Sequence, residues 1–486
     1  MSMSAAGISG FAAYLPPHRV QLEDWCRWTG DQWSKIETVV GHSFRIRGAN
    51  ENAYTMAATA VLRLIERYGV DPAAIGFLGF GTESSTDNSA GAVIIKGMVN
   101  AALQSRNAPE ISRECEVPEF KHACLGGVYA LKSATRYVAT DGSDRVAVVV
   151  CADIAEYARA SSGEPTQGAG AVAMLVEPNA RLLSVGLGQS GSASAYRGAD
   201  FRKPFTRFMG QTPGEFGQPR DFPVFNGKYS TTCYVDEVLA AARHLFARAT
   251  SRPSELLRSM KATFLHRPYQ RMAETGLAFT FLLALALGDG EDLAELAQYA
   301  HGADVDPDDL AAELVAAPDV HALVAAGAPG TELYPLSTRT VRHLRETPQF
   351  AALSTSYGHE RMREVGNLYT ASLPAWMAAG IEQAALAVDT EDAGQILAIG
   401  YGSGDAAELI PMTLADGWRQ AATRIGFAEA LAGSNDLDEA GYIALHEGSQ
   451  GAEVGSSPGV FYIDALGTNT EGFNDLGIEY YRYHSS

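Results

Sequence analysis

The sequence predicts a layered α/β fold, and three observations support this prediction. Short apolar runs at 76–81, 145–152 and 171–176 are typical of strands that are buried on both faces. The stretch 61–68 has apolar residues at i, i+3, i+4 and i+7, which indicates a helix before the first of these runs. The last third of the chain repeats the same order of elements. Strands that alternate with helices favour sheets covered by helices.

The repeated order in the last third begins with a helix-like stretch at 371–387. The apolar run 395–400 then indicates a strand that enters the glycine-rich turn 401–404. No short sequence repeat is visible, so any internal duplication would be structural.

Composition and charge exclude several classes of protein. The chain has 486 residues, 46% hydrophobic and 19% charged, which is too apolar for a disordered chain and too mixed for a membrane bundle. Its net charge of −20 disfavours nucleic acid and anionic membranes as partners. The longest apolar run, 276–288, is shorter than the roughly 20 residues that span a bilayer and indicates a buried helix. With no secretory signal visible, we expect a soluble, cytoplasmic protein.

The segment 289–332 differs from the rest because it holds eleven Asp and Glu residues and neither Lys nor Arg. Asp306 followed by Pro307 is typical of a helix N-cap with proline in the first turn. We interpret the region 289–345 as a solvated, acidic helical insertion. A regulatory or docking element is the alternative. The charge of the whole chain therefore says little about the charge around an active site.

Cys124 is a candidate nucleophile because two glycines and a helical stretch, 128–138, follow it closely. Free backbone N–H groups at a helix N-terminus stabilise a thiolate, so we expect a lowered thiol pKa. Gly126 and Gly127 allow a substrate or a neighbouring backbone to come close. The alternative is a buried structural cysteine, of which Cys151 in its apolar strand is an example.

Two further candidates follow apolar stretches. Glu83 lies directly after the run 76–81, where open α/β sheets place ligand chemistry, and partial burial would suit it to acid–base work. The alternative interpretation of Glu83 is a carboxylate that caps a helix or is solvated. His266 stands two residues before Pro268, and the alternative interpretation is a histidine with a purely structural role.

No HExxH pattern occurs, and the five cysteines are scattered without a CxxC pair, which argues against a metal site or a disulfide framework.

The turn 400–404 is not a dinucleotide fingerprint. The third glycine of GxGxxG would fall on Asp405, and no Walker A sequence occurs in the chain. The turn can instead offer backbone N–H donors to an oxyanion. Cys124, His266 and Glu83 together are the parts of a Cys–His–acid site for acyl transfer.

Several motifs in one order resemble those of the 3-hydroxy-3-methylglutaryl-CoA (HMG-CoA) synthase family of the thiolase superfamily. The first group consists of GTESSTDNS at 81–89, HACLGG at 122–127, ADIAEYA at 152–158 and EPTQGAGAVAML at 164–175. The resemblance continues at 200–204, 223–228, 266–269, 366–372, 401–404 and 461–482. The motifs cover nearly the whole chain apart from the acidic insertion.

The resemblance implies a thiolase-like five-layered αβαβα fold built from two similar halves, acting as a homodimer. We place the halves at 1–180 and 181–486. It also implies an acyltransferase that condenses acetyl-CoA with acetoacetyl-CoA and hydrolyses the enzyme thioester to release HMG-CoA. The CoA thioesters are substrates, and no cofactor or metal is implied.

Residues that match the family's motifs take these implied roles. Cys124 matches the nucleophile that accepts the acetyl group, Glu83 the acid/base, and His266 the group that polarises the ketone of the acetoacetyl thioester. Ser403 lies in the loop whose backbone N–H forms an oxyanion hole with that of Cys124. The residues that match the lining of the acyl pocket are Tyr157, Thr166, Phe201 and Asn367.

The chain departs from the family's pattern at three places, which we interpret as changes at the entrance. The lysine-rich stretch after the glutamate is replaced at 87–92, Arg267 stands where serine is usual, and Arg271 stands near a common CoA-contacting lysine. These changes leave open an alternative, a β-branching synthase that acts on chains bound to an acyl carrier protein in polyketide assembly. A decarboxylating ketoacyl synthase, which Glu83 argues against, and a non-catalytic acyl-binding scaffold are further alternatives.

Overall fold

The computed structural model describes residues 5–485 except for 86, 198–199, 201–222, 224–225, 317, 319, 329–331, 355–356, 388–392 and 449–457. No helix of the described residues is long and apolar enough to cross a membrane. The apolar run 276–288 forms most of a buried helix, α9 (Gln270–Ala286), as predicted.

The N-terminal part of the chain forms one half of a large mixed sheet. Its strands are β1 (Gly7–Tyr14), β4 (Ile75–Gly81), β5 (Glu119–Phe120), β6 (Val146–Ala155) and β7 (Gly168–Glu177). β4 pairs in parallel with β5 and β6, whereas β7 runs antiparallel to both β6 and β1. The three apolar runs predicted as strands are β4, β6 and β7, and nearly every residue in them is buried. Their apolar side chains are covered on both faces of the sheet.

The C-terminal part forms the other half of this sheet. Its strands are β8 (Leu183–Val185), β9 (Gly191–Ser194), β10 (Met260–Leu265), β11 (Gln395–Gly402) and β12 (Ala406–Leu414). β8 pairs with both β1 and β12, so the described strands follow the order β10-β11-β12-β8-β1-β7-β6-β4-β5, with β9 paired to β12. The predicted strand 395–400 is confirmed as β11.

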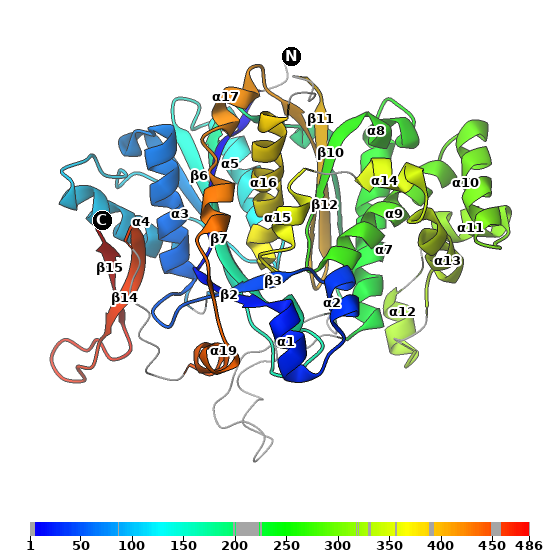
Figure 1. Cartoon of the computed structure of the whole chain (residues 1–486). Coiled ribbons are helices and arrows are strands. Elements are labelled where there is room, and N and C mark those ends of the chain that lie inside the picture. The colour runs from blue at the N-terminus through cyan, green and yellow to red at the C-terminus, as the bar shows by residue number, and fades with distance from the viewer. Residues whose placement is uncertain are drawn as a thin grey trace.

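Helices fill three layers around the two halves of the sheet (Figure 1). α3 (Ala53–Tyr68) and α4 (Gly91–Ser105) cover the outer face of the N-terminal half, and α7 (Lys228–Arg248) and α9 lie outside the C-terminal half. The central layer holds α5 (Gly126–Ala139) and α16 (Ser372–Leu386). α16 contacts strands of both halves and is apolar nearly all round, which suits a helix buried between sheets. The five-layered fold is therefore confirmed, whereas the boundary at 180 stays a prediction.

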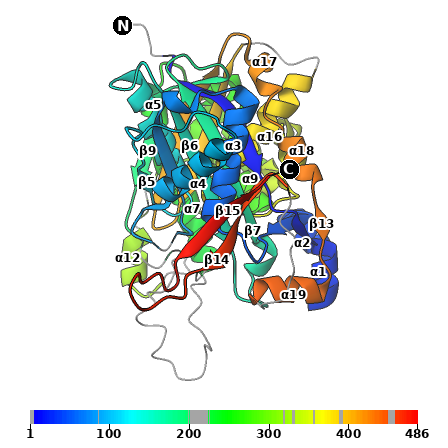
Figure 2. The same ribbon diagram turned by 90° about the vertical axis from the view of Figure 1, so that its left-hand side faces the viewer.

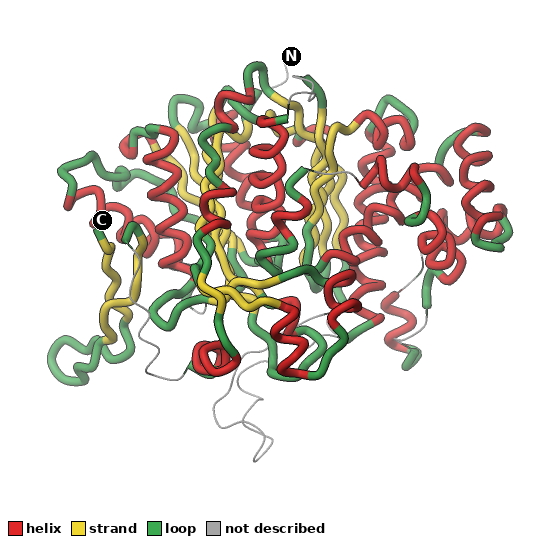
Figure 3. Tube along the Cα trace, in the orientation of Figure 1, coloured by secondary structure: helices red, strands yellow, loops and turns green. Residues whose placement is uncertain are grey.

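The acidic segment folds as helices beside α9 and α7, at one end of the molecule (Figure 3). This region contains α10 (Gly290–Gly302), α11 (Pro307–Val315), α12 (Val320–Ala325), α13 (Pro335–Leu344), α14 (Pro348–Ser354) and α15 (His359–Met362). The predicted cap is confirmed, because the Asp306 carboxylate accepts hydrogen bonds from the backbone N–H groups of Asp308 and Asp309. The extent 289–345 of the insertion stays a prediction.

Smaller elements pack around this sheet. A three-stranded sheet of β2 (His18–Gln21), β3 (Ser43–Ile46) and β13 (Asn435–Asp436) packs with α1 (Leu22–Thr29), α2 (Trp33–Val39) and α19 (Glu439–His446). The hairpin of β14 (Val460–Leu466) and β15 (Glu479–His484) lies across α3 and α4 (Figure 2). The remaining helices are α8 (Pro253–Ser259), α17 (Trp418–Ala422) and α18 (Phe427–Ala432).

Candidate active site

A small cavity of about 70 Å³ lies where the two halves of the fold meet. Residues from distant parts of the sequence line it: Cys124, Tyr157, Ser162, Gly163, Thr166, Asp200, Ser230, His266, Pro268, Tyr269, Met272, Asn367, Tyr401 and Ser403. The structure thus brings together six of the residues predicted from the sequence, namely Cys124, Tyr157, Thr166, His266, Asn367 and Ser403. Phe201, also predicted, lies outside the described residues.

Cys124 lies just before α5, in a turn that packs tightly against its surroundings. A Cβ atom at Gly127 would overlap the Cys151 sulfur, and one at Gly126 would lie 2.5 Å from the Phe120 carbonyl oxygen. Both glycines are therefore needed for close approach, as predicted. The loop 401–404 reaches the same turn, because a Cβ at Gly402 would lie 2.5 Å from the His122 carbonyl oxygen.

The Cys124 thiol points at Glu83, which lies two residues after β4, and donates a hydrogen bond to Glu83 Oε2 at 3.9 Å. Burial raises the thiol pKa well above its usual value, and the carboxylates of Glu83, Asp153 and Asp200 raise it further. The prediction of a lowered pKa is therefore wrong in direction. The position before α5 does not outweigh full burial beside three acids.

Asp153, in β6, fixes the loop that carries Glu83. Its Oδ1 accepts hydrogen bonds from Thr82 Oγ1 (2.9 Å), from the backbone N–H groups of Glu83 (2.8 Å) and Ser84 (3.0 Å), and from Ser84 Oγ (2.7 Å). Its Oδ2 accepts from the Thr370 backbone N–H at 2.9 Å and from the Thr370 hydroxyl. Asp153 therefore ties the Glu83 loop to the segment that follows Asn367. Burial raises the pKa of Asp153, and these hydrogen bonds oppose that rise.

Asp153 lies within the motif 152–158 but was not among the site residues predicted from the sequence. The available signal was a carboxylate inside an otherwise apolar strand, because a buried charge requires several hydrogen-bond donors.

His266 follows β10 directly, and its backbone N–H donates to the Ile399 carbonyl oxygen of β11 at 2.7 Å. Complete burial lowers the pKa of the imidazole to about 3, so the ring is neutral at neutral pH. The ring stacks on Tyr401 with 6.5 Å between centroids. His266 Nδ1 is buried and has no hydrogen-bond partner among the described residues. A neutral imidazole can donate one hydrogen bond to a substrate oxygen without carrying charge into the cavity.

Asn367 is held by its own neighbours in the chain. Its Oδ1 accepts hydrogen bonds from the Tyr369 backbone N–H (2.9 Å) and from Ser372 Oγ (3.1 Å), and its backbone N–H donates to the Thr166 carbonyl oxygen at 3.1 Å. Thr166 and Asn367 are therefore neighbours on the cavity wall. Tyr157 completes this wall, with its ring edge-on to Tyr369 at 6.4 Å between centroids.

A second group of acids, to which the sequence analysis assigned no role, lies at the wall of the cavity. The Tyr401 hydroxyl lies 2.8 Å from Asp200 Oδ2 and 2.9 Å from Asp405 Oδ1. Burial and the neighbouring Asp200 carboxyl raise the pKa of Asp405 to about 8, while Arg197, 3.4 Å from Asp405 Oδ2, opposes this shift. One phenol proton cannot serve two carboxylates, so this group holds an additional proton at neutral pH.

The three departures from the family pattern do not all lie at an entrance. Arg267 is only 2% exposed, beside His266, so its interpretation as an entrance change is wrong. Asn88 and Ser89, in the replaced stretch 87–92, are exposed. Among the described residues, no group of three or more His, Cys, Asp or Glu side chains is placed to hold a metal ion.

Comparisons with known proteins point to one family. The family model described as hydroxymethylglutaryl-coenzyme A synthase N terminal matches residues 3–181. The hydroxymethylglutaryl-CoA synthase erg13B of Aspergillus fumigatus is 31% identical over 245 residues, which cover 50% of this chain and 48% of that protein. A hydroxymethylglutaryl-CoA synthase-like protein of Alternaria alternata is 37% identical over 194 residues, 40% of each chain. The chain thus spans about half the length of the curated relatives it matches.

Solved structures match over the full length. MvaS in complex with 3-hydroxy-3-methylglutaryl coenzyme A has a TM-score of 0.75 and 25% identity, with 99% of each chain covered. The HMG synthase of the curacin biosynthetic pathway, in complex with acetyl donor-ACP, shares the fold with a TM-score of 0.69 at 17% identity, covering 98% of this chain and 99% of that one. The fold, the matched N-terminal region and the order of the motifs agree. Residues 3–181 therefore match the hydroxymethylglutaryl-CoA synthase family, and the fold matches that of a solved protein of this kind over nearly the whole chain.

Proposed function

We propose that this protein condenses an acetyl group carried on Cys124 with acetoacetyl-CoA and releases HMG-CoA by hydrolysis. The observation that carries the proposal is the cavity, which the Cys124 thiol and the neutral His266 imidazole line together, with the Glu83 carboxylate 3.9 Å from the thiol. The relatives named above support it, because the N-terminal match includes both Glu83 and Cys124.

The first step is acylation of the thiol. The hydrogen bond from Cys124 to Glu83 gives the thiol proton an acceptor, so sulfur can attack the acetyl carbonyl although burial raises the thiol pKa. The C–S bond of acetyl-CoA breaks, the departing CoA sulfur takes that proton from Glu83, and Glu83 is again a carboxylate. The products are acetyl-Cys124 and free CoA.

The second step forms the carbon–carbon bond. Glu83 removes a proton from the acetyl methyl group, and the backbone N–H groups of Cys124 and Ser403 stabilise the enolate oxygen. The enolate carbon attacks the ketone carbon of acetoacetyl-CoA. His266 donates a hydrogen bond to the oxygen that becomes negative, and this oxygen then takes the proton held by Glu83.

Hydrolysis completes the cycle. Glu83, again a carboxylate, accepts a proton from a water molecule that attacks the Cys124 thioester. The C–S bond breaks, the sulfur recovers the proton, and the new carboxylic acid loses its remaining proton to solvent and leaves on its CoA. The net reaction consumes acetyl-CoA, acetoacetyl-CoA and water and yields HMG-CoA and CoA.

A carrier-protein substrate is the second candidate. Two observations favour it: the loss of lysines at 87–92, part of which is exposed, and the full-length fold match to a synthase solved with acetyl donor-ACP. In that case the same residues act on an acetyl group or an acceptor that is attached to a phosphopantetheine arm.

The test incubates the protein with radiolabelled acetyl-CoA and acetoacetyl-CoA and follows the acyl-enzyme and the product, with Cys124→Ala as control. Labelled enzyme together with HMG-CoA supports the proposal. Labelled enzyme without product moves the acceptor to a carrier protein or another ketone. If no label is found, repeating the test with acetyl-carrier protein separates a carrier-bound donor from a non-catalytic scaffold. The expected homodimer is tested by light scattering.

A further inference from the structure

The guanidinium of Arg267 is a buried cation for which the proposed reaction has no use. It is only 2% exposed, and burial lowers its pKa to about 10. Glu274 and Glu360 oppose this shift as neighbouring charges, but neither forms an ion pair with Arg267 in the described part of the chain. Burying a cation without a paired carboxylate is costly, so its hydrogen bonds must have a specific geometry to offset the cost.

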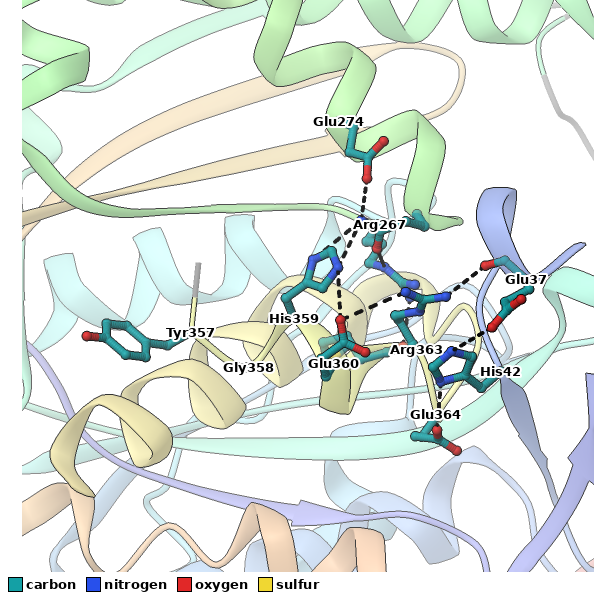
Figure 4. Close-up of polar contacts among 12 residues, drawn as sticks. Glu37, His42, Arg267, Glu274, Tyr357, Gly358, His359, Glu360, Arg363 and Glu364 are labelled. Carbon is teal, nitrogen blue, oxygen red and sulfur yellow. Dashed lines mark hydrogen bonds and ion pairs between the residues drawn. The ribbon is translucent and has the colours of Figure 1, made fainter. Parts of the chain in front are cut away.

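The Arg267 side chain lies among Glu274, Glu360 and Arg363 (Figure 4). The three hydrogen bonds of its guanidinium go to three different segments. Nη1 donates to the Met362 carbonyl oxygen at the end of α15 (2.8 Å), and Nη2 donates to the Val40 carbonyl oxygen after α2 (3.1 Å). Nε donates to the Gln270 side chain in the first turn of α9 (3.2 Å). The planar fork of donors thus joins the turn that follows His266 to α9, α15 and the end of α2.

The segment that begins at Met362 leads to Asn367. Arg363 presents its carbonyl oxygen to the backbone N–H groups of His42 (2.8 Å) and Ser43 (3.1 Å), and the Val365 carbonyl oxygen accepts from the Arg45 N–H at 3.3 Å. The segment is therefore aligned along β3 until Asn367 meets Thr166. Arg267 connects the two chain segments that place His266 and Asn367 on the cavity wall.

We propose that Arg267 is a positioning residue that sets the place of His266 relative to Asn367. Its effect is confined to the part of the site that holds the acceptor. Acylation of Cys124 depends on the Glu83 loop, whose four hydrogen bonds to Asp153 Oδ1 do not involve the segments that Arg267 joins. This inference rests on the proposed function, because His266 acts there only on the acceptor ketone.

The test measures the two half-reactions separately in Arg267→Met and Arg267→Lys. Acetylation of Cys124 by acetyl-CoA should stay within about twofold of the original protein, while single-turnover condensation with acetoacetyl-CoA falls by about 100-fold, as for a misplacement on the order of 1 Å. Lysine should restore little of this loss, because one ammonium cannot reach three acceptors in a plane. If Arg267→Met does not fold, the same two measurements on Arg267→Lys test the proposal.

Arg45→Met is the matched control. The Arg45 guanidinium is also fully buried, with a pKa lowered by burial to about 10, and it also donates to backbone carbonyl oxygens, those of Pro16, Leu431 and Gly433. None of these acceptors lines the cavity. This variant should lose stability but change both half-reactions by the same factor.

NMR of isotopically labelled histidine gives a readout that does not depend on turnover. The His266 ring signals should shift in Arg267→Met and stay in place in Arg45→Met. Unchanged His266 signals, or equal losses in both half-reactions, would overturn the role of Arg267. If the original protein shows neither acetylation nor product, the proposed function fails, and the NMR comparison still decides whether Arg267 positions His266.

Discussion

Replacing Asp153 with asparagine tests whether one buried carboxylate organises the catalytic loop. Asp153 is fully buried and accepts six hydrogen bonds, four at Oδ1 and two at Oδ2. In Asp153→Asn the amide oxygen can keep the four donors of the Glu83 loop. The amide NH₂ then faces the Thr370 backbone N–H, a donor, so this hydrogen bond is lost, whereas the Thr370 hydroxyl can accept from the amide while it donates to the Gly81 carbonyl oxygen.

The expected cost follows from these contacts. Hydrogen bonds to a charged group are worth about 1.5–3 kcal/mol each; the variant loses the one from the Thr370 backbone N–H and leaves this buried donor without an acceptor. A neutral amide costs less to bury than a carboxylate, which offsets part of this loss, so the net destabilisation should be about 3 kcal/mol. A shift of the Glu83 loop against the Asn367 segment on the order of 1 Å, which the weakened link allows, should reduce kcat by about 100-fold.

The assay combines thermal unfolding with condensation kinetics, and Glu382→Gln is the control. Glu382 is also a buried carboxylate that accepts backbone N–H bonds, from Phe427 (2.8 Å) and Ala428 (3.0 Å), but it does not line the cavity. Glu382→Gln should lower the Tm but should not reduce kcat as Asp153→Asn does. If Asp153→Asn lowers Tm and leaves kcat unchanged, Asp153 does not position Glu83.

Three further predictions concern the site and its packing. Below pH 6.5 the unfolded state binds a proton on His266, whereas the folded state, in which the pKa is about 3, does not. The free energy of unfolding should therefore fall as the pH drops, by about 2 kcal/mol at pH 5. Denaturation of His266→Asn should show a shallower pH dependence, and an equal slope would contradict the buried neutral ring. Glu83→Gln removes the carboxylate beside the thiol and should slow condensation by about 10²–10⁴-fold in a product assay, whereas a full rate would exclude Glu83 as the acid/base. Gly127→Ala places a methyl group on the Cys151 sulfur and should cost about 1–3 kcal/mol. Gly97→Ala in α4, with no atom within 4 Å of the new Cβ, should be neutral or stabilising by about 1 kcal/mol, and equal Tm values for the two variants would contradict this packing.

The layered fold could be predicted because buried strands leave a direct pattern in the sequence. β4, β6 and β7 are apolar runs, and a strand covered on both faces must be apolar throughout. Sequence reasoning did not find β1, since its run GISGFAAY is interrupted by glycine and serine, although all eight of its residues are buried. Their burial results from neighbours far away in the sequence, which periodicity does not reveal.

The candidate site could be predicted in its residues but not in its electrostatics. The motifs identified Cys124 and His266, yet the direction of the thiol pKa depends on burial and on three neighbouring carboxylates, which only the fold produces. The network of Asp200, Tyr401 and Asp405 joins two loops that lie some two hundred positions apart in the sequence. The same limit explains Arg267, because nothing in a single sequence shows that the residue after a cavity-lining histidine is buried.

The acyl-enzyme on Cys124 is the central claim, and intact-protein mass spectrometry after incubation with acetyl-CoA or an acetyl-carrier protein tests it most directly. The account predicts a mass increase of one acetyl group that hydroxylamine removes, that peptide mapping places on Cys124, and that is absent from Cys124→Ala. Full acetylation of Cys124→Ala, or no adduct on the original protein with either donor, would contradict it.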